Sequence, residues 1–232
     1  MRTSRFLALL LATALLPGCS RGESPAAESA APASGTATNG GNTAAGERKY
    51  LLESVDDAGV VQLYADGFAS LPLREKTLIY HLAQAAIAGR DIYYDQKHRS
   101  ALEMRRVLDA IAAHPQGIDP AALAEIQRYT KLFWINNGPY NNLTARKFVL
   151  KTTPQAFAAA AQAAVKNGGT IPTAAGESLD AMLTRLQPMF FDANVDPIVT
   201  NKTPAPGQDI LMASANNLYS GVALADLKGF PE

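Results

Sequence analysis

The sequence predicts a mainly α protein, in which a single helical domain follows a signal peptide and a disordered tether. Two observations lead to this fold class. Apolar side chains recur three and four residues apart through most of residues 73–187, and proline, glycine or asparagine interrupts the pattern between successive stretches. The chain has 232 residues, of which 47% are hydrophobic, so it can bury a substantial core.

The first residues are typical of a secretion signal. Arg2 and Arg5 precede the apolar run 6–16, which is too short to span a bilayer as a settled helix. The run ends in Leu16-Pro17-Gly18-Cys19, which resembles the lipobox of bacterial lipoproteins. This resemblance implies cleavage before Cys19 and a lipid on that cysteine, which would anchor the protein to a membrane. An ordinary signal peptide with an incidental cysteine is the alternative.

A change in composition separates the signal from the folded part. The chain is expected to consist of a signal peptide (1–18), a low-complexity tether (19–46) and a helical domain (47–232). The tether holds almost no large apolar side chain, so it cannot bury enough surface to offset its ordering entropy. The expected location is the bacterial cell envelope, lipid-anchored and facing the periplasm. Ser20, directly after the cysteine, favours the outer membrane.

Charge and cysteine content exclude two further features. Lys and Arg together number 21, as do Asp and Glu, so the formal net charge is zero. Because no basic patch stands out, we expect no nucleic-acid partner. The single cysteine excludes a disulfide within the chain, so the domain must be stabilised by its core.

The domain begins with a segment of ambiguous pattern and then a long helix. Residues 60–64 are either a short strand or extended coil. From Leu73 the spacing predicts a helix that starts after Pro72 and that Gly89 weakens or closes. One face of this helix is expected to collect its apolar residues, namely Ile79, Leu82, Ala83, Ala86 and Ile87.

Two more helices are predicted with clear boundaries. The first of these ends at His114-Pro115, because the residue before proline disfavours helical geometry. Its apolar face carries Met104, Val107, Leu108, Ile111 and Ala112. The next begins at Asp119-Pro120, an N-cap followed by proline, and ends at residues 136–139, where Asn or Gly can adopt a left-handed cap.

The remaining elements are shorter. Thr153-Pro154 opens a helix over 155–166, and another runs from Ser178 to about Gln187, where Pro188 is expected to stop it. Several prolines in 192–209 predict a long loop. A last short helix is expected over 222–228.

No complete catalytic or metal-binding set is recognisable. The three histidines, His81, His98 and His114, form neither His-x-x-x-His nor His-Glu-x-x-His. Asp91, Asp95 and His98 would share a helix face, which is either a metal site or a solvated polar face, depending on whether the side chains converge. Ser214 has no identifiable histidine partner and no Gly-x-Ser-x-Gly motif is present. We therefore predict no catalytic residue and no bound metal or cofactor in this chain.

A polar cluster stands out as a possible binding site. It lies between the aromatic pair Phe133-Trp134 and Lys147-Phe148 and consists of Asn136, Asn137, Tyr140, Asn141 and Asn142. Side-chain amides both donate and accept, so they can hold a peptide backbone. Helix capping and turn formation are the alternative, and on the residues alone they are better supported, since Asn is the usual choice there.

Three stretches resemble dipeptidyl peptidase III, a family of zinc exopeptidases that release dipeptides from peptide N-termini. They are Glu75 to Leu82 (EKTLIYHL) with Ala85-Ala86 and Gly89, continuing into Arg90-Asp91-Ile92 and Asp95-Gln96; Asn136 to Tyr140 (NNGPY) with Lys147-Phe148-Val149; and Ser214 to Val222 (SANNLYSGV). The order and spacing of these stretches carry the resemblance, which spans most of residues 70–232.

The resemblance implies a fold, a site and a set of partners. The domain would belong to the upper lobe of a two-lobe metallopeptidase, and the second stretch would line a cleft for oligopeptides. Candidate cleft residues are Asn136, Tyr140, Asn141, Asn142 and Leu143. Leu143 stands where the family has an aromatic residue that contacts peptides. Leucine can still form an apolar wall of the cleft, but it cannot stack on a peptide as an aromatic ring would.

The chain departs from the family in its zinc chemistry. The family motifs His-Glu-x-x-Gly-His and Glu-Glu-x-Arg-Ala-Glu/Asp do not occur in these 232 residues. Zinc therefore belongs to full-length family members, and this chain is expected to be inactive alone. Either it is the N-terminal part of such an enzyme, truncated before the zinc motif, or it is a non-catalytic lipid-anchored module that binds peptides or another partner. A lobe of a larger protein should show an uncovered apolar face.

Overall fold

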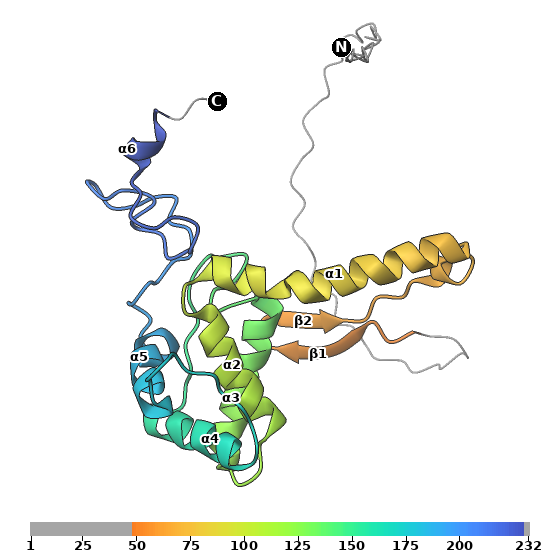
Figure 1. Ribbon diagram of the computed structural model, residues 1–232, viewed down its shortest axis with the longest axis horizontal. Coiled ribbons are helices and arrows are strands. Elements are labelled where there is room, and N and C mark those ends of the chain that lie inside the picture. The colour runs from red at the N-terminus through yellow and green to blue at the C-terminus, as the bar shows by residue number, and fades with distance from the viewer. Residues whose placement is uncertain (1–47, 230–232) are drawn as a thin grey trace, which may run out of the picture. The chain divides into compact units, whose positions relative to one another are not determined.

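The computed structural model describes residues 48–229 and confirms the mainly α, single-domain fold (Figure 1). The predicted signal peptide (1–18), the tether (19–46) and Cys19 lie outside the described residues. The elements in chain order are β1 (Leu51–Val55), β2 (Ala58–Val61), the 3-10 turn η1 (Asp66–Phe68), α1 (Leu73–Lys97), α2 (Ala101–Ala113), α3 (Pro120–Asn136), α4 (Pro154–Lys166), α5 (Leu179–Phe191) and α6 (Leu224–Leu227).

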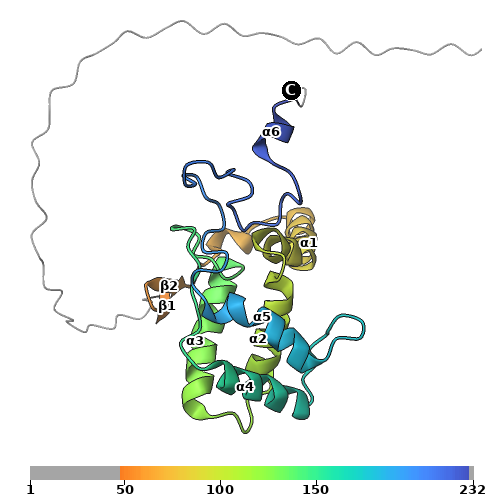
Figure 2. The ribbon, with the colours of Figure 1, turned by 90° about the vertical axis from the view of Figure 1, so that its left-hand side faces the viewer.

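The core lies among α2, α3, α4 and α5, which pack against one another below the loops in Figure 2. Its centre is aromatic: the ring centroids of Phe157 and Phe190 are 4.5 Å apart, and those of Tyr129 and Phe190 are 5.8 Å apart. The predicted apolar face of α2 is confirmed, since Met104, Val107, Leu108 and Ile111 are all 0% exposed.

The helix starts follow the capping rules that the sequence indicated. The side chains of Asp119, Thr153 and Ser178 each accept a hydrogen bond from the backbone N–H three residues later. At the other end of α3, Asn137 takes the left-handed conformation with φ 52°. These local signals explain why α3 and α4 begin and end within a residue or two of their predicted bounds.

The ambiguous N-terminal segment is an antiparallel hairpin. Asp56 has φ 51° at the tight turn between β1 and β2, and Val55 is buried. The strand that the sequence allowed at 60–64 lies earlier, at 58–61, because its partner β1 sets the register. Ion pairs from Lys131 to Glu53 and from Arg128 to Asp56 join the hairpin to α3.

One expectation for α1, that Gly89 closes the helix, was wrong. The helix continues through Gly89 to Lys97, because a single glycine inside a helix costs only about 1 kcal/mol relative to alanine. The residues of the predicted apolar face, Ile79, Leu82, Ala83, Ala86 and Ile87, are all exposed. The N-terminal half of α1 extends away from the bundle (Figure 1), and the buried anchor of the helix is Tyr94.

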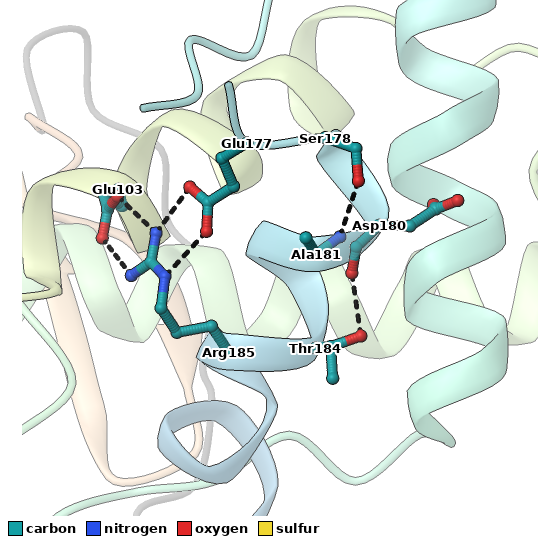
Figure 3. Close-up of polar contacts among 7 residues, drawn as sticks. All are labelled: Glu103, Glu177, Ser178, Asp180, Ala181, Thr184 and Arg185. Carbon is teal, nitrogen blue, oxygen red and sulfur yellow. Dashed lines mark hydrogen bonds and ion pairs between the residues drawn. The ribbon is translucent and has the colours of Figure 1, made fainter. Parts of the chain in front are cut away.

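The predicted stop of α5 at Pro188 was also wrong, because the helix runs on to Phe191. Proline removes one backbone donor, but Met189 and Phe190, which follow it, are buried in the core and hold the last turn in place. Earlier in α5, the Arg185 guanidinium donates to Glu103 of α2 and to Glu177, which precedes α5 (Figure 3). The ion pair with Glu103 links α5 to α2.

The predicted long loop follows α5 and is held by main-chain hydrogen bonds. Lys147 N–H donates to the Pro197 carbonyl, Val199 N–H to Ala145, and Asn217 N–H to Gln96. The final helix, α6, is shorter than the predicted 222–228. Within residues 48–229, no helix has both the length and the apolar character needed to cross a membrane.

Candidate functional site

The candidate site is built on the asparagine loop, residues 137–147, which joins α3 to the chain that runs toward α4. The loop closes on itself, because Tyr140 and Lys147 form an antiparallel bridge and Asn141 N–H donates to the Arg146 carbonyl at 2.9 Å. The Asn141 side chain accepts from the backbone N–H groups of Leu143 and Thr144 at 2.9 and 3.0 Å. Asn141 therefore forms the turn, as the capping and turn alternative expected.

Asn136 joins α3 to this loop. Its side chain is buried and donates to the Leu132 carbonyl, while its oxygen accepts from the Asn142 N–H, both at 2.9 Å. The Asn142 oxygen in turn accepts a hydrogen bond from Lys97 Nζ at the end of α1, and burial lowers the pKa of this lysine. The amide oxygens of Asn136 and Asn142 are thus used to position the loop.

Tyr140 anchors the asparagine loop to the protein interior. It is fully buried, and its hydroxyl donates to the Asp196 carbonyl at 2.8 Å, which fixes the start of the long loop after α5. Burial raises the pKa of this hydroxyl, so Tyr140 stays neutral and holds its hydrogen bond. Tyr140 is therefore a supporting residue and does not face a ligand space.

Leu143 has the opposite environment, with 95% of its surface exposed at the tip of the asparagine loop. Beside it lies a hollow of about 470 Å³, which we call the Leu143 hollow. Both apolar and polar side chains line it, among them Asn136, Asn141, Asn142 and Leu143. The structure thus brings four of the five predicted cleft residues to one hollow and leaves Tyr140 behind it.

Sequence reasoning missed the part of this hollow that comes from the hairpin turn. Asp56 and Asp57 line it together with Arg146 from the loop. Asp56 is neutralised by Arg128, whereas Asp57 has no ion-pair partner among residues 48–229. The one available signal was the Asp56-Asp57 pair itself, which is typical of a turn, but nothing in the sequence places that turn at the same hollow as Leu143.

The possible metal face does not form. Asp91 pairs with Arg105, and Asp95 lies 3.5 Å from the Asn217 amide. His98 lies just after the helix in an extended conformation (φ −167°), and its ring contacts Asp196 instead of the two aspartates of α1. Among the described residues, no three His, Cys, Asp or Glu side chains are grouped to hold a metal ion. Residues 48–229 therefore offer no set of side chains that fits a zinc ion.

His98 is also unsuited to act as a general base. Its Nδ1 accepts from Ser100 N–H and its Nε2 lies 3.0 Å from Asp196 Oδ2, so both ring nitrogens are engaged. Burial lowers the pKa of His98, and the hydrogen bond with Asp196 offsets this in part. Ser214 does not contact it: its hydroxyl accepts from Asn201 N–H and donates to the Ile210 carbonyl. A Ser-His pair is therefore not assembled.

No family model matches this chain, and no curated protein matches it either.

Proposed function

We propose that this chain is the N-terminal part of a dipeptidyl peptidase III-like, zinc-dependent exopeptidase, here without the zinc-binding and catalytic motifs. In this role the domain helps to form a cleft for oligopeptides and does not itself carry out hydrolysis. The membrane would be its second partner, through the lipid on Cys19, and the cell envelope its location. The proposal starts from the three resembling stretches and depends on one structural observation.

That observation is the uncovered apolar surface of α1. Leu82, Ile87 and Ile92 are 60%, 55% and 59% exposed, although a helix in a finished globular domain turns such residues to the core. Apolar residues lie all round the N-terminal half of α1, and a helix of this kind is normally buried on several sides. Further protein packed against α1 would remove this surface from water, as expected for one lobe of a larger enzyme.

The Leu143 hollow supports the peptide-binding part of the proposal. Leu143 offers an apolar contact and Asn142 lies next to it. Asp57, which has no ion-pair partner among residues 48–229, supplies a carboxylate to the same hollow. An extended peptide needs these three kinds of group: apolar contact for side chains, amides for the backbone, and a carboxylate for a terminal ammonium.

The DNA beyond codon 232 tests the enzyme proposal directly. We expect a continuation, in the same or a shifted frame, that encodes His-Glu-x-x-Gly-His followed by Glu-Glu-x-Arg-Ala-Glu/Asp. A stop codon followed by an unrelated gene would contradict it and favour the alternative, a stand-alone lipid-anchored binding module. Purified chain with added zinc should release no dipeptide, and zinc-dependent turnover would refute that expectation.

The peptide-binding role has its own test. Calorimetric titration with the tetrapeptide Ala-Phe-Ala-Ala should give a Kd that rises at least five-fold on Leu143→Gln. Val165→Gln replaces another exposed apolar residue, on α4 and outside the Leu143 hollow, and should leave the Kd unchanged. Equal effects of the two substitutions would argue against a peptide contact at Leu143.

A further inference from the structure

A second hollow, of about 550 Å³, lies where α1, α2 and the end of α3 meet, and we call it the Trp134 hollow. It shares no lining residue with the Leu143 hollow. The groups that matter for binding come from three elements: Arg90 from α1, Arg105 and Asp109 from α2, and Trp134 from α3 with Asn137 as its cap.

Arg105 is held in one position at the wall of this hollow. Only 11% of its side chain is exposed, and its guanidinium lies 4.6 Å from the centre of the Tyr94 ring. Its Nη1 donates to Asp91, and its Nε lies 3.3 Å from Asp109 Oδ2, although the geometry there is not that of a hydrogen bond. Among residues 48–229, nothing accepts from Nη2. Arg105 is therefore a preorganised guanidinium with donors to spare.

Trp134 is fixed beside it and still accessible. The indole N–H donates to Asp109 Oδ1 at 2.8 Å, while 43% of the residue is exposed. Asp109 is thus engaged by Trp134 on one oxygen and approached by Arg105 on the other. The apolar face of the Trp134 ring is therefore accessible to a ligand, while the neighbouring Asp109 carboxylate already has Trp134 and Arg105 beside it.

Arg90 completes the donor set. Its side chain is 59% exposed, and its nearest carboxylate, on Asp91, is 3.9 Å away, so its guanidinium remains available. The amide of Asn137 makes no side-chain hydrogen bond within the described residues. With Asp91 counted, two arginines face two aspartates and the formal charge is zero. Selectivity must therefore come from the surplus of N–H donors over acceptors, not from net charge.

We propose that the Trp134 hollow binds a carboxylate carried on an aromatic or apolar body. Arg90 and Arg105 Nη2 donate to the carboxylate, since guanidinium groups match its two oxygens, and the body packs on the Trp134 ring. The hollow has the size of pockets that hold small molecules. A free aromatic acid and the C-terminal residue of a peptide share this chemistry, and both are tested below. This site is independent of the proposed exopeptidase role.

Trp134 is the single tryptophan of the chain, so its fluorescence reports on this hollow alone. Titration of the purified full chain with N-acetylphenylalanine should change the emission saturably. The corresponding amide, which lacks the carboxylate, should bind at least ten-fold more weakly. Arg90→Gln should weaken binding at least five-fold, whereas Arg106→Gln, on α2 but outside the hollow, should not change it. Arg90 carries the test, because it is exposed and its replacement leaves the fold intact, as circular dichroism should show.

The remaining outcomes decide the proposal and its ligand source. A peptide ending in phenylalanine that binds as tightly as N-acetylphenylalanine identifies peptide C-termini as ligands, and binding of the free acid alone identifies small acids. Equal binding of acid and amide, an unaltered Kd in Arg90→Gln, or no saturable signal in either fluorescence or calorimetry would overturn the proposal.

Discussion

His98 shows how much one buried side chain can do at the junction of α1 and α2. With 1% of its surface exposed, it accepts from Ser100 N–H at the start of α2 and bonds Asp196 in the long loop. Because Nδ1 is an acceptor here, the ring is neutral and carries its proton on Nε2. A second proton on Nδ1 would face the Ser100 N–H, donor against donor. The neutral ring is therefore the form that the fold requires.

A pH dependence of stability follows from this arrangement. Burial holds the pKa of His98 below its unfolded value of about 6.5, despite the opposing effect of Asp196 and with Arg99 and Lys147 adding to the decrease. Above pH 6.5 the stabilisation is complete. As the pH falls from 6.5 toward the lowered folded pKa, the unfolded chain binds the proton first and stability is lost.

Denaturant unfolding at pH 7.5 and at pH 5.5 measures this effect. His98→Gln should unfold more easily at both values but should lose less stability between them, by up to about 1.4 kcal/mol per pH unit. Comparing slopes removes the contribution of the carboxylates, which both proteins share. Parallel slopes for the two proteins would contradict the assignment of this transition to His98.

At the scale of the elements, sequence signals were reliable where they were local. Asp119 and Thr153 cap α3 and α4, as their positions before proline predicted, because an N-cap needs only residues that are adjacent in the chain. Pro188 was misleading, since the burial of Phe190 outweighs the local cost of proline. Spacing identified Leu82 and Ile87 as apolar residues of α1 but could not show whether another part of the protein covers them.

The two hollows show the same limit. Asn136, Asn141 and Leu143 were predicted together because they are close in sequence and belong to a stretch that resembles a family. Asp57 and Trp134 could not be assigned to a site, because their partners lie far away in the chain and only the packing of the elements brings them together. No periodicity or motif records that kind of contact.

Arg185 provides a prediction for the attachment of α5. Hydrogen bonds to Glu103 and then to Glu177 raise the pKa of its guanidinium, and Arg185 in turn lowers the pKa of Glu177 (Figure 3). The arginine is 45% exposed, so solvent screens much of the Coulomb attraction. Because two carboxylates share one fixed guanidinium, we expect a modest contribution larger than that of an isolated surface pair.

Arg185→Gln should therefore lower Tm by roughly 2–4 °C at low salt. Arg106→Gln removes an α2 arginine that forms no ion pair among the described residues, and it should leave Tm unchanged within error. Sodium chloride at 1 M should narrow the difference between Arg185→Gln and the unmodified protein, since salt screens exposed charges. A loss of Tm that does not respond to salt would point to packing instead of ion pairing.

At the scale of the whole molecule, the dominant feature is the contrast between a dense core and an uncovered helix. Leu108 in α2 is 0% exposed, whereas Leu82 in α1 is 60% exposed. Leu108 therefore contributes to the free energy of folding through its burial, whereas Leu82 does not. Removing the buried leucine should cost about 2–5 kcal/mol, because its transfer free energy is lost and a cavity remains.

Replacing Leu82 and Ile87 together by lysine should act in the opposite way. We expect the free energy of unfolding to change by less than about 0.5 kcal/mol, because neither side chain packs on the core. The uncovered surface itself should respond, since contiguous exposed apolar groups bind hydrophobic dyes and promote association. Relative to the unmodified chain, L82K/I87K should show weaker dye fluorescence and less self-association in analytical ultracentrifugation. Unchanged dye binding, or a large loss of stability, would mean that other groups already cover α1 in solution, and the main structural support for a missing partner lobe would be lost.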